Sequence, residues 1–190
     1  MSSPVLHLLA GPNGAGKTTF VERVLIPVTG LPFINADAIA AQRWPGAETV
    51  HAYEAAALAE EQRSRLLAAG ASFISETVFS HPSKVDLVER AVAAGYLVTL
   101  HVILVPEEVT VRRVAYRAAH GGHDVPEAKI RGRYARLWSQ VAAARLVADR
   151  VRFYDNSVAA RPFRLVAVYE HGVEVGESRW PTWTPPTLLS

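Results

Sequence analysis

Residues 11–18 read Gly-Pro-Asn-Gly-Ala-Gly-Lys-Thr and match the pattern G-x-x-x-x-G-K-[ST]. The apolar run from Val5 to Ala10 precedes this motif and is typical of a buried strand. The stretch from Thr18 to Leu25 follows it with helical character, and we expect this helix to close at Pro27. A strand, a glycine-rich turn and a helix in this order are the setting of a phosphate-binding P-loop. The stretch therefore predicts a P-loop NTPase fold with a nucleotide site.

The residue types of the motif suit phosphate binding. Gly11, Gly14 and Gly16 lack a Cβ, so the backbone can close around phosphate oxygens. Backbone N–H groups at the start of the helix favour an anion. Lys17 is expected to reach the β- and γ-phosphates, and the Thr18 hydroxyl to bind Mg²⁺. The expected nucleotide-binding residues of the motif are Gly11, Pro12, Asn13, Gly14, Ala15, Gly16, Lys17, Thr18 and Thr19.

The rest of the chain alternates between strand and helix patterns. Further strands are expected at 32–35, 72–75, 97–105 and 151–154, and further helices at 47–69, 82–94, 107–120 and 126–149. This alternation predicts an α/β protein with a five-stranded parallel sheet and helices on both faces. Two strand-like segments flank His171-Gly172 and predict a C-terminal β-hairpin. We expect residues 1–190 to form a single P-loop kinase-like domain, with a lid of helices at about 107–136 and the hairpin and tail at about 163–190.

Composition narrows the class of protein. The chain has no cysteine, which excludes disulfides, thiolate catalysis and cysteine-ligated zinc. The N-terminal segment has no basic region before its short apolar run, and the longest apolar stretch, 96–106, is too short to span a bilayer. We therefore expect a cytoplasmic protein without a membrane partner. Residues 107–152 hold nine Arg and one Lys against five acids, so this segment favours an anionic ligand.

Two carboxylates follow expected strands. Asp37 comes just after the second strand and Glu76 just after the third, and ligands of parallel sheets bind at the carboxyl ends of strands. Asp37 can take a proton from a substrate hydroxyl that attacks the γ-phosphate, or it can cap the helix that comes after it. Glu76 can bind a Mg²⁺-bound water or substrate hydroxyls, or it can be a solvated loop residue. The residue types alone leave both alternatives open.

Other polar residues follow the fourth and fifth strands. Arg113 and Arg117 lie four residues apart, which places both on one helix face, and Arg133 follows later. Between them, His120-Gly-Gly-His123 has the composition of a hinge, so the arginines suit a lid that closes on a transferring phosphate, or else a solvated basic helix. The two histidines lack further ligands and do not favour a metal site. Asn156, after the fifth strand, can contact adenine or satisfy its own turn.

The combination of motifs resembles the zeta toxin family of P-loop kinases, in its compact branch. The resemblance rests on GPNGAGKTT, FINADAIA, SFISETVFS, RVAYRAAHGGHDVPEAKIRGRY and FYDNS, which span residues 5 to 157. It implies a kinase that uses ATP or GTP with Mg²⁺, and well-known members of the family phosphorylate UDP-N-acetylglucosamine and bind a small helical antitoxin. The roles that it implies are Asp37 as general base, Glu76 and Thr77 in substrate binding, and Arg113, Arg117 and Arg133 in the lid. We add Arg63 as a substrate-binding candidate, and Lys17 and Asn156 remain catalytic and nucleotide-binding candidates.

Two other functions compete with a small-molecule kinase. A kinase of polynucleotide ends or nucleotides would use the basic segment at 107–152 to bind nucleic acid. A regulatory NTP-binding module would need no phosphoryl acceptor and would present a partner surface. Trp180 and Trp183 are candidate anchors for such a surface, although they can equally cover the domain's own apolar edge. Asp37 and Glu76 favour the kinase, because a pure switch does not need two carboxylates near the γ-phosphate.

Overall fold

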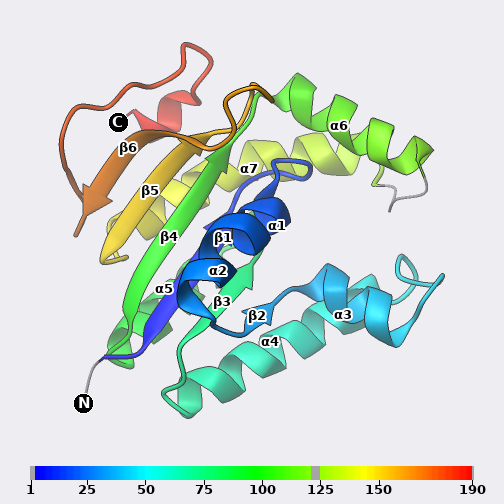
Figure 1. Ribbon diagram of the computed structural model, residues 1–190, viewed down its shortest axis with the longest axis horizontal. Helices are drawn as coiled ribbons and strands as arrows, with labels where there is room; N and C mark the ends of the chain where they lie inside the picture. Colours follow the sequence, from blue (N-terminus) through cyan, green and yellow to red (C-terminus); the bar gives the residue numbers. More distant parts are fainter. Residues whose placement is uncertain (1–2, 121–124, 190) are drawn as a thin grey trace.

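The computed structural model describes residues 3–120 and 125–189, and a seven-stranded sheet forms its centre (Figure 1). The strands lie in the order β2-β3-β1-β4-β5-β6-β7; the first five are parallel, and β6 and β7 are antiparallel to their neighbours. The strands are β1 (Val5–Ala10), β2 (Phe33–Ile34), β3 (Phe73–Glu76), β4 (Leu97–Leu104), β5 (Arg150–Asp155), β6 (Arg164–Glu170) and β7 (Val173–Glu174). The expected α/β fold with five parallel strands is confirmed.

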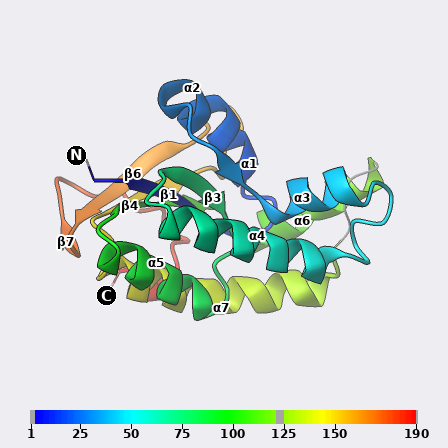
Figure 2. The same ribbon diagram turned by 90° about the horizontal axis from the view of Figure 1, so that it is seen from below.

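Helices cover both faces of the sheet (Figure 2). The helical segments are α1 (Lys17–Phe20), η1 (Val21–Leu25), α2 (Ile26–Thr29), α3 (Ala36–Arg43), α4 (Ala52–Ala68), α5 (Ser83–Ala93), α6 (Glu107–Ala119), α7 (Glu127–Arg145) and η2 (Pro186–Leu188). The helices α4, α5 and α7 pack on one face, and α1, η1 and α2 pack on the other. This two-sided cover explains why β4 has a nearly continuous apolar sequence: six of its eight residues are buried.

Three expected helices have different limits in the structure. Pro27 does not end the first helix, because the helical run passes through the π-helical turn η1 just before it and continues through α2 to Thr29. The helix expected at 47–69 begins only at Ala52, after a turn in which Trp44 stacks on His51 with ring centroids 4.6 Å apart. The helix expected at 126–149 ends earlier, at Arg145.

The C-terminal hairpin is present but its second strand is short. His171 and Gly172 both have positive φ, 48° and 78°, which suits a tight hairpin turn. Beyond Glu174 the chain stays beside β6 through two isolated backbone hydrogen bonds, in which Val175 N–H and Arg179 N–H donate to β6 carbonyls. The hairpin thus extends the central sheet.

The tail packs against the rest of the molecule. Trp180 and Trp183 contact the main core cluster, and the Trp180 ring lies 4.9 Å from that of Phe153. Buried Leu188 adds to the same cluster, and Arg145 donates a hydrogen bond of 2.9 Å to its carbonyl oxygen. These contacts favour the interpretation in which both tryptophans cover an apolar edge of the protein itself.

Candidate active site

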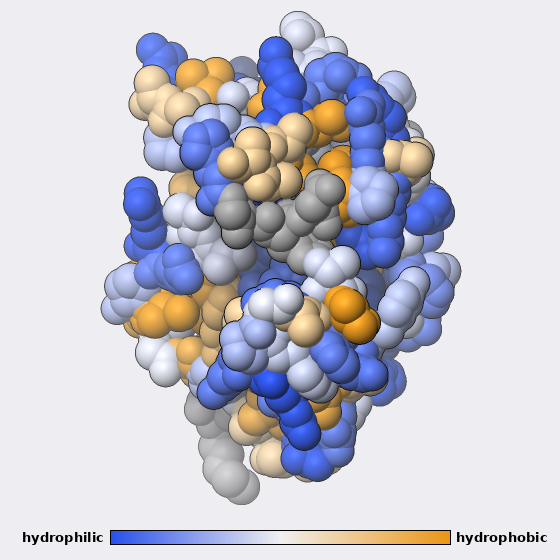
Figure 3. All heavy atoms as spheres, turned by 90° about the vertical axis from the view of Figure 1, so that its right-hand side faces the viewer, coloured by the Kyte–Doolittle hydropathy of each residue, from blue (hydrophilic) through white to orange (hydrophobic). Residues whose placement is uncertain are grey.

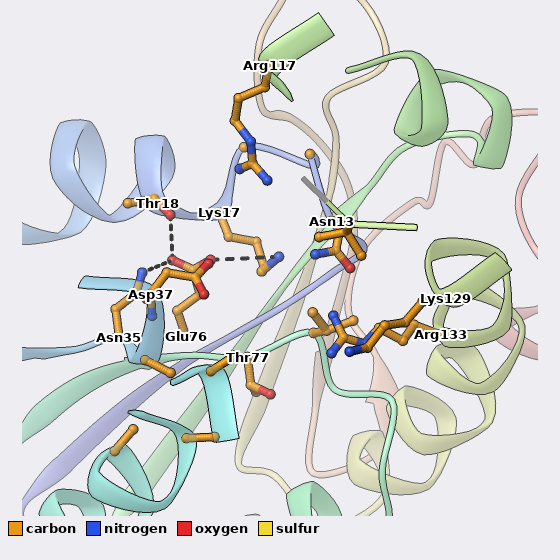
Figure 4. A pocket seen from close by; sticks show the side chains of 18 of the residues that line it. Asn13, Lys17, Thr18, Asn35, Asp37, Glu76, Thr77, Arg117, Lys129 and Arg133 are labelled. Carbon is orange, nitrogen blue, oxygen red and sulfur yellow. Dashed lines mark hydrogen bonds and ion pairs between the residues drawn. The ribbon is translucent and has the colours of Figure 1, made fainter. Parts of the chain in front are cut away.

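The P-loop joins β1 to α1 at the carboxyl edge of the sheet. Gly14 and Gly16 have φ values of 71° and 90°, a backbone conformation that favours glycine. A Cβ added at Gly16 would lie 2.7 Å from the side-chain nitrogen of Asn156, so that position also lacks the space for a side chain. Asn13 and Thr19 line the adjoining cavity, and Figure 4 shows the Asn13 side chain at its edge. The loop has the shape of an anion cradle.

Lys17 lies inside this loop. Its side chain is only 6% exposed, and Nζ donates a hydrogen bond of 3.0 Å to the Pro12 carbonyl oxygen. Burial lowers the pKa of Lys17, against the opposing influence of the Glu76 and Asp37 carboxylates. The two carboxylates therefore do not fully offset the cost of burying the ammonium group, and a bound phosphate would add the negative charge that stabilises it.

Glu76, at the end of β3, connects three elements of the site. Its Oε2 accepts hydrogen bonds from the Thr18 hydroxyl at 2.7 Å and from Asn35 Nδ2 at 2.9 Å, and its Oε1 lies 3.7 Å from Lys17 Nζ (Figure 4). A hydroxyl and a carboxylate so close to the P-loop are the hard oxygen donors that Mg²⁺ takes in P-loop proteins. The geometry favours a magnesium-binding Glu76 over a solvated loop acid.

Asp37 lies in the first turn of α3, and it does not cap that helix. Asn35 is the cap: its Oδ1 accepts hydrogen bonds from Asp37 N–H at 2.7 Å and Ala38 N–H at 3.3 Å. The capping alternative for Asp37 is therefore wrong. Asp37 is exposed and lines the cavity, and Figure 4 shows it beside Glu76. The signal for Asn35 was its position directly before a helical pattern, where asparagine is a preferred cap.

Thr77 follows Glu76 into the cavity. Its hydroxyl oxygen accepts a hydrogen bond of 3.2 Å from Phe79 N–H, which orients the side chain. Phe79 is fully buried and has a φ of 67°, a costly conformation for an aromatic residue. The packing of Phe79 thus fixes the loop that carries Thr77, a feature with no signal in the sequence.

The two arginines of α6 have different surroundings. Arg113 donates hydrogen bonds to the carbonyl oxygens of Asn156, at 2.9 Å, and Gly14, at 3.4 Å, so it supports the P-loop backbone. Arg117 is exposed, lines the cavity and is close enough to Lys17 to lower its pKa. Arg113 also lines the cavity, so its role as a lid arginine stays a prediction. Arg133 lines the cavity from α7 (Figure 4).

Asn156 also supports the P-loop. Its buried amide donates to the Ala15 carbonyl oxygen at 2.7 Å and accepts from Phe163 N–H at 3.4 Å. The structure thus uses this side chain to join β5 to the loop. The sequence allowed two roles for Asn156, a contact to adenine or hydrogen bonds within the protein. These contacts favour hydrogen bonds within the protein, although the partner is the P-loop rather than the residue's own turn.

One cavity of about 540 Å³, a size typical of ligand sites, is lined by most of the expected site residues. The expected residues that do not line it are Gly11, Pro12, Ala15 and Asn156. Beyond the P-loop it reaches Arg63, which is 4% exposed and donates to Glu60 and Ser75. It is also lined by Lys84 and Lys129, which sequence reasoning missed. All three lysines of this arginine-rich chain thus line the cavity, a placement that only the fold reveals.

The histidines near the lid do not form a metal site among the described residues. His120 Nδ1 lies 2.8 Å from the Tyr116 carbonyl oxygen, and its ring stacks on that of Tyr116. Gly121, Gly122 and His123 of the expected hinge lie outside the described residues. Across residues 3–120 and 125–189, no three histidine or acidic side chains gather as metal ligands would, and no helix has the length and hydrophobicity to cross a membrane.

Comparisons with known proteins agree with this architecture. The family model described as AAA domain matches residues 6–138, from β1 into α7. Among curated proteins, none matches the chain.

Solved structures share the fold at low sequence identity. A chain of the PezAT chromosomal toxin–antitoxin system of Streptococcus pneumoniae has a TM-score of 0.59 and 17% identity, over 82% of this chain and 69% of that one. The complex of AvrRxo1-ORF1 and AvrRxo1-ORF2 with ATP has a TM-score of 0.64 and 20% identity, over 91% of this chain and 60% of that one. A putative kinase from Chloroflexus aurantiacus has a TM-score of 0.54 and 21% identity, over 64% and 70%. At the level of the fold, these structures confirm the resemblance to zeta toxin-like P-loop kinases.

Proposed function

The chain belongs to the AAA domain family, and on that basis we propose that it transfers the γ-phosphate of ATP or GTP to a hydroxyl group of a small molecule. The observation that carries this proposal is the convergence of the P-loop Lys17 with Asp37 and Glu76 in one cavity. A protein that only binds a nucleotide needs the lysine but has no use for a second carboxylate near the γ-phosphate.

In this proposal the nucleotide phosphates bind to the backbone of residues 11–16 and to Lys17, while Asn156 and Arg113 support the loop from behind. Thr18 and Glu76 would hold Mg²⁺, since their oxygens lie only 2.7 Å apart at the mouth of the loop. The ion would neutralise charge on the phosphate oxygens. In this proposal the P-loop therefore binds the nucleotide, and the residues around the acceptor supply the base and the charge stabilisation for the transfer step.

The transfer step requires a base and a group that stabilises developing charge. As the acceptor oxygen bonds to the γ-phosphorus, its proton moves to the Asp37 carboxylate. The bond between the γ-phosphorus and the bridging oxygen breaks, and ADP or GDP leaves with that electron pair. Arg117 and Arg133 would stabilise the charge on the transferring group. Thr77 and Arg63 would orient the acceptor.

A labelling experiment tests the proposal. The protein is incubated with γ-labelled ATP and a metabolite extract, and the compound that gains the label is identified. The Lys17→Ala variant is the control, because loss of its ammonium should abolish labelling through weak nucleotide binding. A wild-type protein that binds ATP but labels no compound would refute the phosphotransferase and leave the regulatory module.

Two finer proposals derive from the resemblance to zeta toxins. A UDP-N-acetylsugar is the first defined acceptor to test, and a 5′-hydroxyl oligonucleotide is included because labelling of it would indicate a polynucleotide kinase instead. The similar PezAT structure comes from a toxin–antitoxin system, so the proposal extends to a small protein inhibitor. Co-purification from native cells, followed by an assay of phosphoryl transfer with and without the bound protein, tests that extension.

A further inference from the structure

The charge of the cavity exceeds what a nucleotide can neutralise. Among residues 3–120 and 125–189, seven cationic and two anionic side chains line it, including every lysine of the chain. ATP with one Mg²⁺ carries about two net negative charges. Arg63 and Lys84 also contact the Glu60 carboxylate, so an excess of about two positive charges remains, and such a field attracts anions.

Part of this excess lies away from the P-loop, at the carboxyl end of β3. Arg63 on α4 and Lys84 in the first turn of α5 both approach one oxygen, Glu60 Oε2, at 2.7 Å and 3.7 Å. Arg90 binds the other oxygen of the same carboxylate at 2.9 Å. One carboxylate thus serves three cations, of which Arg63 and Lys84 line the cavity.

Lys84 is the cation of this group with the weakest contact to Glu60. Its side chain is 19% exposed, and burial, followed by the charge of Arg63, lowers its pKa. Its place in the first turn of α5 adds the positive end of a helix of eleven residues. A partly desolvated ammonium beside a guanidinium and a helix start gains most from a second anion.

We propose that Arg63 and Lys84 bind an oxyanion group, a phosphate or a carboxylate, of the phosphoryl acceptor. The inference rests on the proposed function, because it places the acceptor in this half of the cavity. Arg63 contributes a guanidinium fixed by Glu60 and Ser75, and Lys84 contributes a mobile point charge. The acceptor is then an anionic small molecule whose charged group lies on the β3–α5 side, while its hydroxyl faces Asp37.

The test measures anion binding without phosphoryl transfer. The protein is saturated with Mg²⁺ and a non-hydrolysable ATP analogue, which fills the P-loop, and inorganic phosphate or acetate is added at constant ionic strength in chloride. Reductive methylation followed by mass spectrometry then gives the reaction rate of each lysine, of which the chain has only three. Lys84 methylation is expected to slow severalfold with at least one of the two anions, and Lys129 methylation much less.

The stronger of the two anions indicates whether the acceptor carries a phosphate or a carboxylate. Unchanged Lys84 methylation with both anions, or equal protection of Lys129, would overturn the proposal. In the Arg63→Met variant, the anion concentration that protects Lys84 to half its maximum is expected to rise about tenfold, the effect of one charge-assisted hydrogen bond. Arg65→Met is the matched control, since Arg65 is 74% exposed on the same helix.

If the Arg63→Met variant does not fold, the methylation rates of Lys84 and Lys129 in the wild-type protein, with and without each anion, still test the proposal. The protection assay also separates this inference from the proposed function, because protection by an anion can be measured without any labelled product. If the labelling experiment identifies a neutral acceptor, the anion subsite is refuted and the proposed phosphoryl transfer is not. In the extract assay, Lys84→Met is expected to raise the KM for the acceptor about tenfold and to leave the KM for ATP unchanged.

Discussion

Asp37 and Glu76 lie side by side, yet their carboxylates have different surroundings. The Glu76 side chain is 12% exposed and accepts hydrogen bonds from Thr18 and Asn35. Asp37 is exposed, and its backbone N–H, rather than its carboxylate, takes part in the cap of α3. A carboxylate that is committed to a hydroxyl donor next to the P-loop suits a metal, whereas one that faces the open cavity can reach an acceptor hydroxyl. These surroundings are consistent with the proposed roles, Mg²⁺ binding for Glu76 and proton transfer for Asp37.

Asp37→Asn separates a base from a structural residue. Asparagine cannot take the acceptor proton, so phosphoryl transfer is expected to fall by about 10²- to 10⁴-fold. Affinity for ATP and the melting temperature should stay nearly unchanged, because Asn35 and not Asp37 caps the helix. The assay is transfer to the acceptor identified by labelling, with Asp86→Asn, an exposed acid in the first turn of α5, as the control. Transfer at the wild-type rate in Asp37→Asn would refute the base.

Arg117→Ala tests the lid. Since Arg117 lines the cavity near Lys17, it is expected to act on charge that develops during transfer. The variant should lower kcat by about 10²-fold or more while the KM for ATP changes little. Arg117→Lys should restore only part of the rate, because lysine lacks the planar fork. Steady-state kinetics checks this, with exposed Arg112→Ala as the control; a normal kcat in Arg117→Ala would place Arg117 on a solvated helix face.

At the scale of elements, the P-loop depends on a side chain from α6 and on one from the residue directly after β5. Arg113 and Asn156 bind carbonyl oxygens of Gly14 and Ala15, so two distant parts of the chain set the shape of the loop. Removing the Asn156 amide would leave a buried carbonyl oxygen without its donor, a cost of about 1–3 kcal/mol. The loop would then populate shapes that bind phosphate less well.

Asn156→Ala is therefore expected to weaken ATP binding by about tenfold and to lower the free energy of unfolding by about 1–3 kcal/mol. Calorimetric titration with ATP and urea unfolding measure the two effects. Asn156→Asp provides the comparison: it keeps an acceptor for Phe163 N–H but places a carboxylate against the Ala15 carbonyl, so it should be worse than alanine. An alanine variant with unchanged ATP affinity would show that β5 does not support the loop.

The sequence predicted these elements unevenly, for physical reasons. The P-loop and the acids after the strands were predictable, because strand order along the chain already places the carboxyl ends together. The start of α4 at Ala52 was not, since residues 47–51 contain no proline or glycine to mark a boundary, and the Trp44–His51 stack that competes with the helix is a tertiary contact. The roles of Arg113 and Asn156 depend on where α6 and β5 lie relative to the loop.

At the scale of the whole molecule, the cavity is where separate elements meet. Its lining comes from the P-loop, from α1, α3, α4, α5, α6 and α7, and from the end of β3 with the loop after it, and no local pattern marks Lys84 as part of it. The three lysines are far apart in the sequence, and only the fold brings them to the lining of one cavity. The end of the molecule that carries the tips of α3 and α6 presents hydrophilic side chains with apolar ones interspersed among them (Figure 3).

Two histidines lie next to each other on β1 and β4: His101 is buried, and His7 is partly buried. His7 Nδ1 lies 3.1 Å from His101 Nε2. The His101 ring also packs against Phe20, and its Nδ1 lies 3.5 Å from the Tyr154 hydroxyl oxygen. Burial, then the charges of His7 and Arg152, lowers the pKa of His101 to about 3. Burial and Arg152 lower the pKa of His7 as well. The fold thus disfavours the protonated form of both rings, and most strongly that of His101.

This burial makes the stability of the whole molecule depend on pH. In the unfolded chain a histidine takes up a proton near pH 6.5, whereas folded His101 does not do so until about pH 3. Protons therefore favour the unfolded state as pH falls below 6.5, and His101 alone should remove about 2 kcal/mol of stability between pH 7 and pH 5. His7 adds to this loss. The carboxylates with lowered pKa values, such as Glu60 and Asp155, contribute only at lower pH.

Urea unfolding at pH 7 and pH 5 measures the difference. The His101→Phe variant keeps a ring among Phe20 and Tyr154 but has nothing to titrate, so its loss of stability between the two pH values should be smaller than that of the wild type by about 2 kcal/mol. Its absolute stability does not matter, because the comparison is between two pH values of the same variant. The exposed His81→Gln variant should behave like the wild type. An equal pH dependence in His101→Phe and wild type would show that folded His101 takes up its proton as readily as the unfolded chain does.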